Sequence, residues 1–135
     1  MRKEIIDLIM REGRLKHSVH RGAVDWTNYP FDEFPRALCV LIDDTTLFQP
    51  DGGFDNMNLS IEVACRMPES PIGPDDNLFE DIRSELQRII LVLLSAADSE
   101  GDALVVKADQ SARLVEFHDT QLQVQGVAVT LNLTY

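Results

Sequence analysis

The sequence predicts an α+β fold: a mostly antiparallel β-sheet of about five strands, with one long helix and an N-terminal helix packed on one face. Three stretches carry this prediction: an alternating segment over residues 57–67, a helical repeat over 78–97 and an apolar run over 37–42. At 135 residues the chain can bury one core but not two independent ones. We therefore expect a single domain spanning residues 1–135.

Alternation of apolar and polar residues runs through MNLSIEVACRM, residues 57–67. Apolar side chains recur at every second position from Met57 onward, and Asn58, Ser60 and Glu62 lie between them. Successive side chains of a strand point to opposite faces of a sheet. The pattern therefore predicts a strand with one buried face.

The first 35 residues predict one helix followed by an irregular segment. The helix runs from residue 2 to about 16, and Gly13 weakens its end. Residues 18–35 contain four aromatic residues and two prolines with little periodicity, so we expect their rings to pack on the core, with a ligand cage as the alternative. The inward face of the helix holds Ile5, Ile6, Leu8, Ile9 and Leu15.

Six consecutive apolar residues, ALCVLI at 37–42, predict a strand covered on both faces and therefore placed inside the sheet, beside the alternating strand. The segment between these two strands contains PDGG at 50–53, which predicts the tip of a long hairpin. Leu47, Phe48 and Phe54 flank that tip. Apolar residues on such a hairpin either fold back on the body or contact a partner.

The long helix is predicted by its start signals and by its period. Asn77 as N-cap and Glu80 three residues later form a capping box, and Asp75 and Asp76 suit the positive end of the helix dipole. We expect the helix to end at Gly101, within DSEGD. Its inward face holds Leu78, Phe79, Ile82, Leu86, Ile89, Ile90, Leu93 and Ala97, and its outward face Asp81, Arg83, Glu85 and Arg88.

Three further strands are predicted over residues 103–108, 113–118 and 122–135. In the last of these, Leu122 and Val124 share one parity, whereas the apolar residues from Val127 onward share the other. Gly126 lies at the change of phase. A β-bulge at Gly126 would reset the register and bend the strand, so we expect one there.

The charge of the chain is negative overall and unevenly placed. Twelve basic residues against 23 acidic ones give −11, which repels phosphate and argues against nucleic-acid binding. Residues 1–21 carry +3, so the remainder carries −14. This basic arm is either a solvated amphipathic helix or a segment that lies on a neighbouring acidic subunit.

Cys39 and Cys65 fall at apolar positions of predicted strands, which favours buried free thiols and folding in a reducing cytoplasm. No apolar run reaches membrane-spanning length. His17, His20 and His118 are too scattered for a ligand set, and no HExxH, Cys-x-x-Cys, nucleophile elbow or phosphate loop occurs. We therefore expect no catalytic residue, no metal and no cofactor.

The order of elements resembles a known family. An N-terminal helix and an aromatic segment precede Phe34 and Pro35, which lead into ALCVLI; the strand LSIEV (59–63), one long helix and a final strand ending at Tyr135 follow. Over nearly its full length, and through loose hydrophobic patterns, this order resembles the tail terminator proteins of lambda-like long-tailed bacteriophages. Head–tail joining and tail completion proteins share much of the pattern, and the phase change at Gly126 would fit that group.

The resemblance implies a ring, usually a hexamer, that docks on the last ring of the tail tube, stops its growth and presents a surface to the head–tail connector. The implied partners are copies of the chain, the major tail tube protein and connector proteins, with viral DNA passing through an acidic bore. The implied location is the head–tail junction of the virion, after assembly in the host cytoplasm. Neither specific nucleic-acid binding nor a membrane is expected. The candidate subunit or tube contacts are Phe48, Asp51 and Phe54 of the hairpin and Arg11, Arg14 and Lys16 of the basic arm.

Two other classes of function stay open. A small-ligand-binding module or enzyme would have a cleft beside the long helix, where Met57 and Met67 would mark an adaptable pocket. An acidic DNA mimic would need its charges to run along one face.

Overall fold

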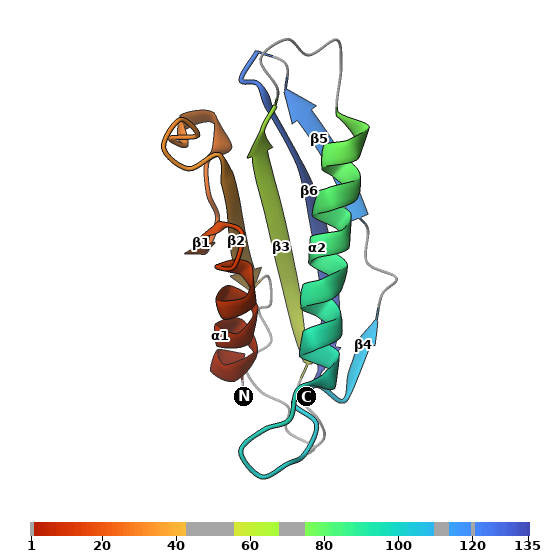
Figure 1. Ribbon diagram of the computed structural model, residues 1–135. Coiled ribbons are helices and arrows are strands. Elements are labelled where there is room, and N and C mark those ends of the chain that lie inside the picture. Colours follow the sequence, from red (N-terminus) through yellow and green to blue (C-terminus); the bar gives the residue numbers. More distant parts are fainter. Residues whose placement is uncertain (1, 43–55, 68–74, 110–113, 120) are drawn as a thin grey trace.

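The computed structural model describes residues 2–42, 56–67, 75–109, 114–119 and 121–135. The described strands form one mixed sheet in the order β1-β2-β3-β6-β4, with β5 also paired to β6. Figure 1 shows both α-helices on the same face of this sheet, which confirms the predicted α+β class. The elements are α1 (Arg2–Gly13), β1 (Ser18–Arg21), the 3-10 helix η1 (Trp26–Asn28), β2 (Arg36–Ile42), β3 (Asn56–Arg66), α2 (Asp76–Ser95), β4 (Lys107–Asp109), β5 (Leu114–Asp119) and β6 (Val124–Thr134).

Strand β3 is central in the sheet, and one of its faces is buried, as its alternating sequence predicts. It pairs antiparallel with β2 on one side and with β6 on the other. Leu59, Ile61 and Val63 point toward the helices and are fully buried. They pack in one core with apolar residues of both helices, such as Ile5 and Ile89.

The opposite face of the sheet is divided between a polar part and an aromatic part. Its polar residues pair across strands, as Asn132 Nδ2 donates to Asn58 Oδ1 at 2.8 Å and the hydroxyls of Ser60 and Thr130 lie 3.0 Å apart. At the other end of this face, an aromatic cluster covers the sheet. The prediction that the rings of residues 18–35 pack on the core is therefore confirmed for three of the four rings. The exception is Phe34, which is 37% exposed. The cluster consists of Phe31, Ala64 and Val124 with Trp26, Tyr29 and Phe117.

Two N-terminal expectations are wrong. Helix α1 ends at Gly13, so Leu15 lies beyond it and is 70% exposed instead of facing inward. Residues 18–21, expected to be irregular, form β1, which pairs parallel with β2 from Ser18↔Ala37 to Arg21↔Val40. The other strand pairs among the described residues are antiparallel.

Helix α2 begins and ends earlier than predicted. Asp75, not Asn77, is the N-cap, and its side chain accepts hydrogen bonds from the backbone N–H groups of Asn77 and Leu78. The helix ends at Ser95, because Ala96 is extended and Ala97 pairs with Ala103 in an isolated bridge. Gly101, with φ of 89°, belongs to the turn that follows.

Strand β6 contains no bulge at Gly126. Its register with β3 runs unbroken from Asn56↔Thr134 to Arg66↔Val124. The apparent change of phase arises because the start of β6 is buried on both faces: Val124 packs under the aromatic cluster, and Gln125 occupies the helix-side position. Gln125 is fully buried because its amide pairs with both backbone groups of Asp75, each at 2.8 Å.

A shift in pairing does occur elsewhere, at the edge of the sheet beside β6. Strands β4 and β5 both pair with β6, but the pairing shifts by two residues between Lys107↔Thr134 and Leu114↔Val129. The strand predicted over 103–108 is therefore mostly wrong, since Leu104 and Val105 pack into the core before β4 begins. Cys39 and Cys65 are buried and free, as expected.

Candidate interaction surfaces

The residues predicted as contacts fall into two groups in the structure. Arg11 lies in the last turn of α1, and Arg14 and Lys16 follow the helix; all three are exposed. Phe48, Asp51 and Phe54 lie outside the described residues. The structure therefore places only the basic half of the predicted set.

Lys16 takes part in an ionic network between α1 and α2 that is centred on the buried carboxylate of Glu85. Glu85 of α2 is only 3% exposed and lies 3.6 Å from Lys16 Nζ. Arg88 donates to both Glu85 oxygens, at 2.7 and 3.2 Å, and to Glu12 of α1 at 3.0 Å. The hydrogen bond from Arg88 holds the pKa of Glu85 below its usual value.

The burial of Glu85 corrects the prediction that it faces outward. A helix packed against both a sheet and a second helix buries more than one face, and α2 contacts α1 as well as β6. The side of α2 that carries Glu85 and Arg88 is the one that α1 covers. Ion pairs take the place of apolar packing there.

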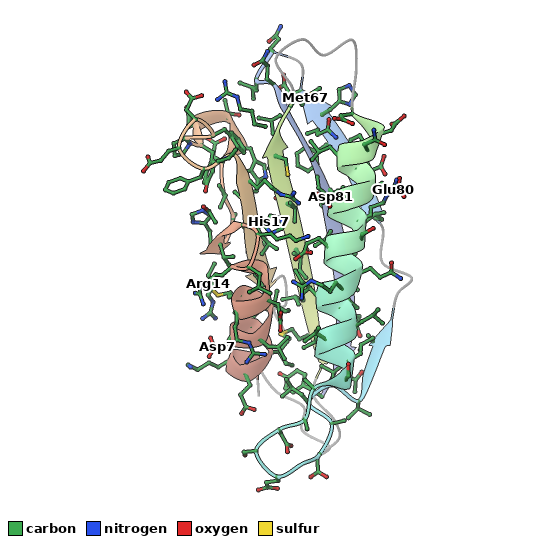
Figure 2. The ribbon with its side chains drawn as sticks, viewed as in Figure 1. Asp7, Arg14, His17, Met67, Glu80 and Asp81 are labelled. Carbon is green, nitrogen blue, oxygen red and sulfur yellow. The ribbon has the colours of Figure 1, made fainter. Side chains whose placement is uncertain are left out.

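A second polar chain continues this network onto β2. Arg36 donates from Nη1 to Asp81 at 2.7 Å and from Nη2 to His17 Nε2 at 3.4 Å. The opposite ring nitrogen of His17 lies 3.2 Å from the carbonyl oxygen of Gly13. Figure 2 shows His17 between α1 and α2, with Asp81 on the facing helix. Burial, together with the charge of Arg36, lowers the pKa of His17 and keeps the ring neutral.

We define the basic edge as the exposed residues Lys3, Arg11, Arg14, Leu15 and Arg21 on the α1–β1 side of the molecule. Lys3 pairs with Asp7 at 2.8 Å, and Figure 2 shows Asp7 and Arg14 on the outer side of α1. That hydrogen bond lowers the pKa of Asp7, and the nearby charges of Arg21 and Arg14 contribute to the same effect. Beside this edge, Leu15 and Phe34 line a shallow hollow of about 370 Å³.

We define the groove edge as the opposite side of the molecule, where α2 faces β5 and β6. A groove of about 320 Å³ lies there, with Arg83 and Gln87 among its polar lining. Leu91 is 56% exposed and Leu114 47% exposed, and the side chains of Arg83 and Glu116 pair at 2.5 Å. The apolar lining consists of Leu86, Ile90, Leu91, Leu114, Val129 and Leu131.

The sequence suggested a cleft beside the long helix as an alternative but missed the residues that line this groove. One signal for them is Leu91, an apolar residue off the predicted inward face of α2. The predicted markers of a pocket, Met57 and Met67, are 1% and 2% exposed and belong to the packed interior. A cleft beside the long helix therefore exists, but other residues line it.

The thiols and the acidic side chains offer little reactive chemistry. Burial raises the pKa of Cys39 to about 12 and that of Cys65 to about 11, so both thiols stay protonated and unreactive near neutral pH. Within the described ranges, no group of three or more His, Cys, Asp or Glu side chains is placed to hold a metal ion. No helix in the described part of the chain is long and apolar enough to span a bilayer.

Comparison with known proteins adds no relative. No family model matches the sequence, and no curated protein matches it significantly.

Proposed function

We propose that this protein is a structural subunit of a phage tail: a tail terminator that forms a ring, caps the tail tube, ends its polymerisation and provides the surface for head joining. The proposal combines the resemblance in the order of elements with the distribution of charge. In this role the chain works by assembly. That it has no catalytic activity stays a prediction.

The observation that carries the proposal is the separation of charge between the two edges of the sheet. Residues 1–21, which contain α1 and β1, carry +3. Residues 75–119, which contain α2, β4 and β5, carry eleven acidic and four basic residues, net −7. Two of these acidic residues, Asp81 and Glu85, face β2 and α1 instead and are paired there, which leaves −5 for the rest of the segment. Figure 1 shows these two groups of elements at opposite sides of the sheet. Opposite charge at opposite edges favours head-to-tail contact between identical copies, and such contacts close into rings when the rotation permits.

The overall charge of −11 supports a conduit rather than a nucleic-acid binder. An acidic surface repels phosphate, so DNA can pass through a ring without being held. A head–tail joining protein would need the same property. The one feature that favoured the joining group, a bulge at Gly126, is absent from β6, whose described pairing with β3 is continuous.

The proposal is tested by adding the purified chain to polymerising tail tube protein from the phage that encodes it. Tubes should stop growing when the chain is present, and labelled chain should be found at one tube end. A Leu41→Arg variant, which changes a 37% exposed residue of β2 on the face of the sheet opposite the helices, serves as the matched control and should stop growth equally well. If the wild-type chain leaves the tube lengths unchanged, the proposal is refuted.

The groove favours one other candidate, a site for a small apolar molecule. Its volume of about 320 Å³ is at the lower end of ligand pockets, and Arg83 could pair with a carboxylate at its rim. A thermal-shift screen with medium-chain carboxylates tests this candidate. Stabilisation of the wild-type chain that is lost in Leu91→Arg would favour ligand binding.

A further inference from the structure

The exposed apolar side chains of this protein are concentrated at the two edges of the sheet. Leu15 and Phe34 lie near the basic edge. Four others lie on α2, on β5 or next to β4: Leu91, Val106, Leu114 and Val115, of which Leu91 and Leu114 line the groove. The remaining two exposed large apolar residues among those described, Leu41 on β2 and Leu122 before β6, lie outside both edges. Solvent-exposed apolar residues gathered in this way mark surfaces that become covered.

The two edges also complement each other in charge and shape. The basic edge presents Arg11 on α1, Arg21 beside Lys3 and Asp7, and Arg14 next to the exposed Leu15. The groove edge presents an apolar hollow, and the exposed acidic residues Glu80, Glu116 and Asp119 belong to its elements. Glu116 pairs with Arg83 of the groove lining, and Asp119 accepts from the backbone of Gln121 and Leu122, so Glu80 is the acidic group best placed for the arginines of another copy. Figure 2 shows Glu80 on the outer side of α2, away from α1.

We infer that the basic edge of one copy docks on the groove edge of the next, with Leu15 seated against Leu91 and Leu114 and the arginines facing the acidic groups. The inference deepens the proposed ring and rests on it for its biological setting. A second copy is the fitting occupant because one chain carries both complementary surfaces. Since they lie at opposite edges, a single copy can engage two neighbours at once.

Docking of this kind would also cover the sheet edges. Among the described strands, β1 is outermost on one side, and β4 and β5 are outermost on the other. An open edge presents unpaired backbone groups that can recruit other strands. A heterologous contact between the two edges covers both and uses each only once per copy.

The test uses one variant for each edge. Arg14→Glu with Leu15→Asp alters the basic edge at two exposed positions, and Leu91→Arg places a positive charge in the groove. Leu41→Arg is the matched control on β2. Circular dichroism and thermal melting establish that every variant is folded, and sedimentation velocity at low salt measures its mass.

The wild type and Leu41→Arg should associate beyond the dimer, whereas each edge variant alone should remain a monomer, with self-association at least about tenfold weaker. The two edge variants mixed in equal amounts should form a one-to-one dimer and nothing larger, because each retains the edge that the other lacks. High salt should weaken wild-type association.

Three outcomes would overturn the inference: a wild type that is monomeric at every attainable concentration, an edge variant that still self-associates, or a mixture of the two variants that stays monomeric. The proposed function fails separately. If the chain associates edge to edge but does not stop tube growth, this inference stands and the tail-terminator role is refuted.

Discussion

Gly126 shows how one residue in β6 is fixed by its neighbours. A methyl group in place of its hydrogen would overlap the carbonyl oxygen of Val63 and the ring of Phe117. Phe117 lies opposite Gly126 in the β5–β6 register, so its ring covers the space that a side chain would fill. Glycine is required here by close approach, not by a bend in the strand.

Replacing Gly126 by alanine should lower the free energy of unfolding by about 1–3 kcal/mol, because overpacking forces the neighbours to move. Urea denaturation measures the effect. The Phe117→Ala background should not restore stability, since the backbone oxygen of Val63 remains in place. Gln121→Ala, an exposed change in the turn before the same strand, is the control and should stay within about 0.5 kcal/mol. A neutral Gly126→Ala variant would contradict the close approach.

His17 makes stability depend on pH. Its pKa is lowered in the folded chain, chiefly by burial and then by the charge of Arg36, against the opposite influence of Asp81 and Glu85. The unfolded chain therefore binds a proton more readily. Stability is fully present above the unfolded value of about 6.5 and falls as the pH drops below it.

The unfolding free energy of the wild type should consequently decrease from about pH 7 to about pH 5, and His17→Gln should flatten that slope. His118→Gln, at an exposed position of β5, provides the control and should retain the wild-type slope. Denaturation curves at a series of pH values give the comparison. Equal slopes in the wild type and His17→Gln would show that His17 is not held neutral.

Helix α2 is positioned by its first turn as well as by its apolar face. Asp75 caps the helix with its carboxylate, while its backbone is clamped by Gln125. The two interactions join the start of α2 to the start of β6 at the same end of the molecule. This joint fixes where the helix begins over the sheet.

Loss of the cap should be measurable. Asp75→Ala should reduce the unfolding free energy by about 1 kcal/mol, whereas Asp75→Asn keeps a capping oxygen and should be nearly neutral. Asp76→Ala, at the exposed next position, is the matched control. Urea unfolding, with hydrogen exchange of the first turn, compares the three. An Asp75→Ala variant as stable as Asp75→Asn would argue against the cap.

The elements that the sequence predicts well are those with long, unambiguous periods. The strand over 57–67 and the strand over 37–42 were within one residue of β3 and β2. Four-residue β1 has too few positions for a period, and its parallel partner lies many residues away. The phase of β6 was misread at Gln125, because a polar residue in a strand is normally assigned to the solvent-facing side. Gln125 is buried because it forms hydrogen bonds with the backbone of a residue 50 positions away in the sequence.

The molecule as a whole carries a positive edge and a negative edge on one sheet. The sequence predicted the positive edge, since six of the twelve basic residues of the chain lie within the first 21 positions. It suggested a cleft beside the long helix but could not predict the lining, because α2, β5 and β6 are brought together only by folding. The separation of charge across the sheet supports assembly of copies, and assembly is the basis of the proposed role in the phage tail.

The most direct test of this role is the length of tail tubes in electron micrographs of a phage that lacks this protein. Without it, tubes should grow beyond the length of virion tails and heads should remain unjoined, and supplying the wild-type chain should restore normal particles. Normal virions with tails of uniform length in the absence of the protein would contradict the account.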